Sequence, residues 1–258
     1  MASTNTIAFL GATGDCAGYC LSLSLKAGYT CRALARTPEK LRESMRTKDV
    51  SQDTLDKYLS VVEGNAKDES AVRKVLVANN GEVVDTVVFG IGAAPKLRFH
   101  IMPVTMDQPT ICRDAMATLL SALQSLNAPK KPLLVDISTT GISDGPRDVA
   151  LLLIPLYKWA LHTPHVDKRE TEKLIAGAVG QGTGEGKGER AIRAAVIVRP
   201  SLLMNGVAKG PQHVRVGSED KPAVGYTIRR ADVGEWIFER CVKGRGKGVE
   251  GQKVTLTY

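Results

Sequence analysis

A glycine-rich turn near the amino terminus is the strongest candidate for chemistry in this sequence. The apolar run Ile7–Leu10 leads directly into Gly11-Ala12-Thr13-Gly14-Asp15-Cys16-Ala17-Gly18, and a helical pattern follows. Gly11 permits a tight turn out of a strand, and Gly14 lets the backbone approach a pyrophosphate. The first turn of the helix would offer free N–H groups and a positive dipole end to the phosphates. The pattern predicts a dinucleotide-binding turn, with the Asp15 side chain pointing to solvent.

The end of the second predicted strand indicates which dinucleotide binds. An NAD-binding chain usually carries an acid about 20 residues after the glycine turn, where it holds the ribose hydroxyls. Here the strand ends in Arg36, and Lys40 stands one helical turn further on. Arginine can bind a 2′-phosphate through two charge-assisted hydrogen bonds, although Arg36 also fits an ordinary surface position. We expect NADP(H) as the cofactor.

Two further stretches follow predicted strands and extend this site. The segment Gly64–Asp68 stands where Rossmann proteins contact adenine, and the segment Gly90–Pro95 carries glycines that allow the backbone to lie against a ribose. With the turn and the basic pair, the expected cofactor contacts are Gly11, Ala12, Thr13, Gly14, Asp15, Cys16, Arg36, Lys40, Asn65, Ala66, Gly90, Ile91 and Gly92.

The elements that must position these residues alternate between short apolar runs and amphipathic helical segments, which is the pattern of a parallel α/β sheet. The expected strands are Thr6–Leu10, Thr30–Leu34, Leu59–Val62, Thr86–Phe89, Leu133–Ile137, Ala195–Val198 and Lys253–Leu256. The expected helices are Ala17–Ala27, Pro38–Thr47, Glu69–Val77, Pro109–Leu126, Asp167–Ala178 and Ala231–Val242. We therefore predict one doubly wound Rossmann domain over residues 1–258, with a flexible glycine-rich surface loop at residues 177–189.

Composition narrows the function classes. The 258 residues carry a net charge of +8, but the basic residues are scattered and only 5% of residues are aromatic, so a nucleic-acid surface is not expected. The longest apolar stretch, 149–161, contains Pro155 and Lys158 and is too short for a membrane span. No secretory signal is visible, and the five scattered cysteines fit a reduced, cytoplasmic protein with no metal site.

Cys16 and Cys20 stand four residues apart on one predicted helical face. They fit either a redox pair or two small residues that pack the helix. The spacing favours packing, because residues separated by one helical turn suit a disulfide poorly.

With these motifs, the chain resembles an atypical short-chain dehydrogenase/reductase of the NmrA-like group. The resemblance is carried by residues 11–14, 32–36, 64–66, 135–139, 198–200 and 231–233 and covers nearly the whole chain. It implies a parallel sheet of about seven strands and a small substrate-binding part formed by the C-terminal third over the nicotinamide. It also adds Ser138, Lys168 and Pro200 to the expected cofactor contacts.

The resemblance places the chemistry at a Ser/Thr, a Tyr and a Lys, with the tyrosine four residues before the lysine. Lys168 matches the lysine and Thr140, or else Ser138, matches the Ser/Thr, but Pro164 stands at the tyrosine position and cannot donate a proton. The candidates to replace the tyrosine are His165, His162, Tyr157, Arg98 and His100. Of these, we take His165 and Tyr157, with Lys168 and Thr140, as the candidate catalytic residues.

The expected function is an NADPH-dependent oxidoreductase that acts on a small or medium organic substrate, a carbonyl or an enone. Two alternatives remain open at this point. One is an isomerase or cyclase that retains the dinucleotide. The other is a non-catalytic NADP(H)-sensing regulator that binds a protein partner, which the missing tyrosine favours. The sequence does not decide between a monomer and a homodimer.

Overall fold

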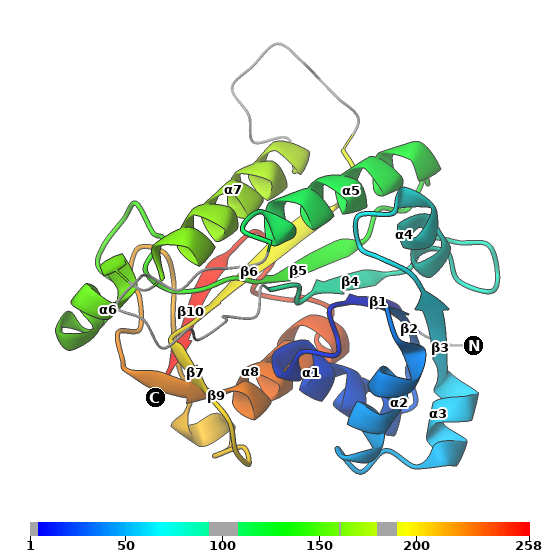
Figure 1. Ribbon diagram of the computed structural model, residues 1–258, viewed down its shortest axis with the longest axis horizontal. Helices are drawn as coiled ribbons and strands as arrows, with labels where there is room; N and C mark the ends of the chain where they lie inside the picture. The colour runs from blue at the N-terminus through cyan, green and yellow to red at the C-terminus, as the bar shows by residue number, and fades with distance from the viewer. Residues whose placement is uncertain (1–4, 93–107, 160, 180–189) are drawn as a thin grey trace.

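The fold is built on one eight-stranded sheet in the order β3-β2-β1-β4-β5-β6-β10-β8 (Figure 1). The computed structural model describes residues 5–92, 108–159, 161–179 and 190–258. The strands are β1 (Thr6–Leu10), β2 (Thr30–Ala35), β3 (Leu59–Glu63), β4 (Thr86–Phe89), β5 (Leu133–Ile137), β6 (Ala194–Pro200), β8 (Arg215–Gly217) and β10 (Lys253–Thr257). All neighbours are parallel except β8, which pairs antiparallel with β10 at one edge. The predicted doubly wound parallel sheet is confirmed, with one short strand more than expected.

Helices cover both faces of the sheet (Figure 1). One face carries α1 (Asp15–Lys26), α2 (Pro38–Arg46), α3 (Gln52–Tyr58), α8 (Arg230–Ile237) and the π-helical segment η3 (Phe238–Lys243). The other carries α4 (Glu69–Leu76), α5 (Ile111–Leu126) and α7 (His162–Ala178). Strand β1 shows why both layers are needed: Ile7 and Phe9 belong to one core cluster, and Ala8 and Leu10 belong to the other.

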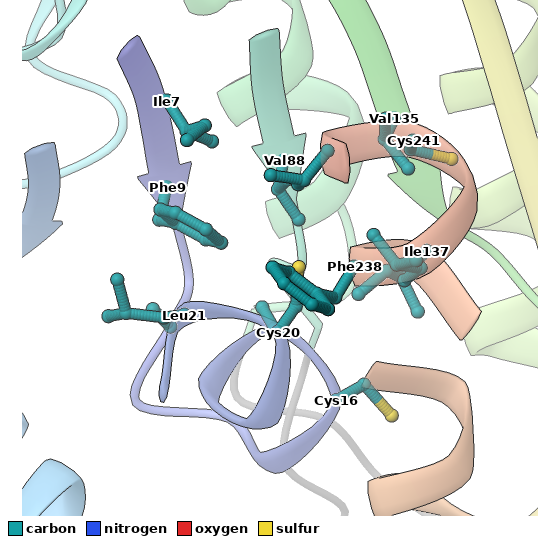
Figure 2. Packing of buried hydrophobic residues seen from close by; sticks show 14 of the residues in the cluster. Ile7, Phe9, Cys16, Cys20, Leu21, Val88, Val135, Ile137, Phe238 and Cys241 are labelled. Carbon is teal, nitrogen blue, oxygen red and sulfur yellow. The ribbon is translucent and has the colours of Figure 1, made fainter. Parts of the chain in front are cut away.

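The core between the sheet and the layer of α1 and α8 explains the paired cysteines (Figure 2). Cys16 and Cys20 are free and buried on α1, and Phe238 and Cys241 of η3 belong to the same cluster. Burial raises the pKa of the Cys16 thiol to about 12 and that of Cys20 well above its usual value. Both thiols are therefore protonated packing groups, as the spacing favoured.

Strand order reverses beside β1. The chain runs from β1 through β2 to β3 on one side and then returns to place β4 on the other side of β1. Leu10 of β1 is in register with Leu34 of β2 and with Phe89 of β4, so the three strands end at the same level. In a doubly wound sheet this reversal opens a crevice at the carboxyl ends of the strands, where ligands bind.

Several elements differ from the sequence-based expectation. Helix α7 begins at His162 rather than Asp167, because Pro164 falls in the first turn, where no intrahelical N–H bond is lost. The expected helix end at Ala178 is confirmed, so Gly177 and Ala178, which the expected loop also included, belong to α7; residues 180–189 lie outside the described part. Elements not expected are α3, α6 (Ile154–Trp159), the short 3-10 turns η1 (Leu151–Leu153) and η2 (Pro211–His213), β7 (Leu202–Met204), β8 and β9 (Thr227–Arg229). Strands β7 and β9 form a separate two-stranded parallel sheet.

None of the described helices is long and apolar enough to cross a bilayer.

Candidate functional site

A cleft of about 410 Å³ opens at the carboxyl edge of the sheet, where the strand order reverses. Its size lies in the range of small-molecule sites. It is lined by Gly11, Thr13, Gly14, Leu34, Ala35, Arg36, Gly64, Asn65, Ala66, Gly90, Ile91, Gly92, Gln108 and Ile111. Most of these residues were expected from the sequence. Leu34, Ala35, Gln108 and Ile111 were not among the expected contacts; the last two stand just before and at the start of α5 and carry no recognisable motif.

The floor of the cleft depends on Gly11. Its φ of +86° suits glycine, and a Cβ at this position would lie 2.7 Å from the carbonyl carbon of Gly90 and from the amide nitrogen of Ile91. The two turns that follow β1 and β4 are thus in direct backbone contact. A Cβ on Gly90 would in turn lie 2.7 Å from the Cβ of Ala17, which brings α1 against the end of β4.

Gly14 has a different role in the same turn. It is the N-cap of α1 in an extended conformation, with φ −80° and ψ 144°, and it is exposed. A Cβ there would lie 3.2 Å from the Gly11 carbonyl oxygen, a tight contact that a shift of a few tenths of an ångström relieves, and the only other described atom within 4 Å is the Gly90 carbonyl oxygen at 3.9 Å. The open space belongs to the cleft that Gly14 lines. Backbone N–H groups of the first turn of α1 are therefore accessible to an anion.

Three expected contacts lie behind this turn and are not among the residues that line the cleft. Ala12 and Cys16 have buried side chains, so only their backbone remains for a ligand. The Asp15 carboxylate is exposed, as expected, and accepts a hydrogen bond from Lys48 Nζ at 3.2 Å.

The end of the cleft beside β2 carries the expected arginine. Arg36 is exposed and lines the cleft directly after β2, whereas Lys40 is exposed on α2 but does not line it. Asn65 also lines the cleft, after the neighbouring strand β3, in a loop fixed by local bonds. Its Oδ1 accepts from the Lys67 N–H at 3.1 Å, and the Asp68 carboxylate caps α4.

Lys168 lies beneath the cleft as part of a buried ion pair. Its Nζ donates to the carbonyl oxygens of Ile91 at 3.1 Å and of Ile137 at 2.7 Å, and it lies 3.6 Å from Asp136 Oδ1. Burial raises the pKa of Asp136 to about 6. Burial alone would lower the pKa of Lys168, but Asp136 and other nearby acids raise it above its usual value. Lys168 is therefore a cation that joins the ends of β4 and β5.

A second buried charge pair holds the expected residue Ser138. The Ser138 hydroxyl donates to Glu172 Oε1 at 2.6 Å, and Arg199 donates to both oxygens of the same carboxylate at 3.0 and 2.5 Å. This pair links β5, α7 and β6. Ser138 is thereby committed to the scaffold and is not among the residues that line the cleft.

Thr140, Tyr157 and His165 form a third cluster, beyond the end of β5. The Thr140 hydroxyl lies 3.3 Å from the Tyr157 hydroxyl, and the Pro200 carbonyl accepts from the Thr140 N–H at 3.1 Å. The rings of Tyr157 and His165 are 5.3 Å apart. Gly141 makes this contact possible, because a Cβ at its φ of +85° would lie 2.5 Å from the Tyr157 ring.

Burial sets the protonation states in this cluster. It raises the pKa of Tyr157 above its usual value, so the phenol is protonated at neutral pH. It lowers the pKa of His165 to about 4, helped by the charge of Arg169, so the imidazole is neutral. His165 Nε2 is buried without a hydrogen-bond partner in the described structure. The remaining candidates are the exposed His162, and Arg98 and His100, which lie outside the described residues.

A turn in which Gly11 has no space for a side chain, an open helix N-terminus and an arginine after β2 together define a Rossmann-type dinucleotide-binding protein. Residues 11–242 match the family described as NAD(P)H-binding, and the chain belongs to this family. The predicted resemblance to atypical short-chain dehydrogenases/reductases of the NmrA-like group is thereby confirmed.

Two relatives match this chain over nearly its whole length. It is 43% identical over 265 residues to the reductase pytE of Aspergillus terreus and 38% identical over 287 residues to the oxidase pynE of Aspergillus niger; each match covers 99% of both chains. A short-chain dehydrogenase/reductase from Veillonella parvula, solved in complex with NADP, shares the fold with a TM-score of 0.66 and 14% identity, over 98% of this chain and 94% of that one. The chain is an NAD(P)H-dependent oxidoreductase, which sets aside the non-catalytic alternative.

The first prediction concerns Gly14. We expect Gly14→Val to weaken NADPH binding at least about 100-fold, or about 2.7 kcal/mol, because the branched side chain enters the cleft. The fold should persist, since the extended backbone of Gly14 suits valine. Fluorescence titration and circular dichroism measure the two effects. Gly145→Val is the matched control, since Gly145 is exposed and absent from the cleft lining. Unchanged affinity in Gly14→Val would place the cofactor elsewhere.

The second prediction concerns acid stability and follows from His165. The unfolded chain takes up a proton near pH 6.5, whereas the folded chain does so only near pH 4. His165 therefore contributes stability that is fully present above pH 6.5 and is lost as pH falls toward 4. Between pH 7 and 5 this loss amounts to at most about 2 kcal/mol of unfolding free energy.

His165→Phe keeps a ring beside Tyr157 but cannot be protonated. We expect urea unfolding of this variant to show a smaller loss of stability between pH 7 and 5 than the native chain shows. Comparing the two slopes removes any constant packing change and the titration of Asp136, which both proteins share. Identical slopes would mean that His165 is solvated and titrates normally.

Proposed function

We propose that the chain reduces a carbonyl or enone group of a small or medium organic substrate with NADPH, and that Tyr157 is the proton donor. The observation that carries this proposal is the 3.3 Å contact between the Tyr157 and Thr140 hydroxyls. Thr140 stands at the Ser/Thr position of the family pattern, and Pro164 occupies the usual tyrosine position. The hydroxyl of a different tyrosine, Tyr157, therefore contacts the Thr140 hydroxyl.

The chemistry requires one hydride and one proton. A bound reduced nicotinamide would supply the hydride, and the chain must supply the proton to the developing oxyanion. The Tyr157 phenol is protonated at neutral pH and is only 5% exposed, so its proton is kept from bulk water. Thr140 holds the phenol oxygen in place, because its own hydroxyl and N–H both reach the Pro200 carbonyl.

Two of the other candidates take supporting roles in this proposal. His165 is neutral, so it packs against the Tyr157 ring and does not act as a cationic acid. Lys168 fixes the backbone of Ile91, which lines the cleft, to that of Ile137, three residues before Thr140. Thr140 and Tyr157 do not line the cleft themselves, so the proposal connects the hydroxyl pair to it through Ile137, Lys168 and Ile91.

Preference for NADPH over NADH is the second part of the proposal. The position of Arg36 in the cleft lining, at the end of β2, supports it. Exposed arginine at this position forms bidentate bonds with a 2′-phosphate, whereas a ribose hydroxyl gains little from it.

The third prediction tests this preference. Native protein should bind NADPH at least about tenfold more tightly than NADH, a difference of about 1.4 kcal/mol. Arg36→Asp should remove or reverse the difference in titrations with both nucleotides. Lys40→Asp makes the same charge change one turn away, outside the cleft lining, and should have a smaller effect. Equal affinities in the native protein would contradict the assignment.

The fourth prediction tests Tyr157. Tyr157→Phe should lower kcat by about 10²–10⁴-fold, since a general acid contributes that much, and leave the Kd for NADPH unchanged. NADPH oxidation would be followed across a panel of carbonyls and enones. Tyr226→Phe is the matched control, because Tyr226 is exposed.

The companion variants separate the candidates. Thr140→Ala should lower kcat in the same direction as Tyr157→Phe, and His165→Phe should retain activity at neutral pH. Full activity in Tyr157→Phe, together with an inactive His165→Phe, would move the proton donor to the imidazole. Full activity in all three would place the reaction away from this cluster.

A further inference from the structure

Arg230 stands at the first position of α8, next to the helix that begins the dinucleotide site. Helices α1 and α8 pack closely: a Cβ on Gly234 would lie 2.7 Å from the Cys16 carbonyl oxygen and 2.5 Å from the Tyr19 Cβ. Further along, the Phe238 ring makes an edge contact with Tyr29, after the end of α1. The two helices therefore run in the same direction. Arg230, one turn before Gly234, therefore lies toward the glycine turn that precedes α1, although it is not among the residues that line the cleft.

We propose that Arg230 is a further ligand of the dinucleotide and binds its pyrophosphate from the side opposite the glycine turn. The proposal rests on dinucleotide binding by this family and does not depend on which substrate is reduced. It assigns the C-terminal third of the chain a contact with the cofactor as well as with the substrate.

The hydrogen bonds of Arg230 leave the guanidinium ready for an anion. Nη1 donates to Asn205 Oδ1 at 2.6 Å and to the Leu203 carbonyl at 3.3 Å. Within the described chain these are its hydrogen bonds, so Nε and Nη2 form an edge not engaged by protein. That edge has the fork geometry that matches two phosphate oxygens. Anchoring through Nη1 holds the fork in place before the ligand arrives, which lowers the entropy cost of binding.

The charge of Arg230 reaches the first turn of α1. Burial raises the pKa of the Cys16 thiol, and Arg230 is the strongest influence that opposes this rise. The same turn carries the Asp15 carboxylate, which would repel a pyrophosphate and is paired with Lys48. A second cation beside the turn offsets this repulsion. The guanidinium of the neighbouring Arg229 donates instead to the Val207 carbonyl.

The test compares two ligands and two adjacent arginines. NADPH contains the pyrophosphate, whereas adenosine 2′-monophosphate contains only the adenine ribose and the 2′-phosphate. We expect Arg230→Met to weaken NADPH binding about 10- to 100-fold, as for a lost hydrogen bond to a charged group, and to leave adenosine 2′-monophosphate within about twofold. Arg229→Met removes the same charge and should leave both affinities unchanged. Arg230→Lys, which retains the charge but not the fork, should give an intermediate loss for NADPH.

The outcomes separate this role from a structural one. Equal weakening of both ligands by Arg230→Met, with a lower melting temperature, would mean that Arg230 only anchors β7 to α8 and would overturn the proposal. Unchanged NADPH affinity in Arg230→Met, or an equal loss in Arg229→Met, would do the same. If Arg230→Met does not fold, Arg230→Lys decides, because a purely structural role predicts no difference between the two ligands. NADPH binding by the native protein is measured alongside, so a failure of cofactor binding itself is recognised separately.

Discussion

The direct backbone contact between the turns after β1 and β4 is the constraint on which the rest of the site depends. Neither Gly11 nor Gly90 leaves space for a side chain, and the Cβ of Ala17 fills the remaining volume. This contact sets the distance of α1 from the sheet, and with it the height of the helix N-terminus above the strand ends. A bulkier residue at any of the three positions would lift α1 and close the cleft, because interiors packed to this density do not yield locally.

The cofactor half of the molecule could be predicted from sequence because its determinants are local. Glycines within eight residues make the turn, the strands are short runs of apolar residues, and the parallel order follows from alternation with helices. Asn65 and Ile91 were found for the same reason, since each directly follows a strand. Strand β8, by contrast, has three largely exposed residues and pairs only because β10 offers a free edge. Its sequence therefore shows no apolar periodicity from which a strand could be predicted.

The half that surrounds Thr140 was less accessible to prediction, because its contacts join distant segments. Tyr157 reaches Thr140 only after the intervening chain folds back on itself, with the Asp148 carboxylate accepting the Gly141 N–H. Asp136 is hidden in a strand that reads as apolar, and its importance appears only when Lys168 of α7 lies beside it. Pro164 predicts that the tyrosine of the family pattern is missing from its usual position. It could not indicate that the apolar run 149–161 contains the helix α6, which brings the Tyr157 hydroxyl to the Thr140 hydroxyl.

The position of Lys168 also bears on how the two ligands influence each other. One ammonium group holds the carbonyl of Ile91, in the lining of the cleft, and the carbonyl of Ile137, at the root of the segment that carries Thr140. A ligand that immobilises the first carbonyl immobilises the second through the same cation. Part of the ordering that a substrate would otherwise impose on the Thr140 segment is then complete before it arrives. Coupling free energy is reciprocal, so each ligand retains the other.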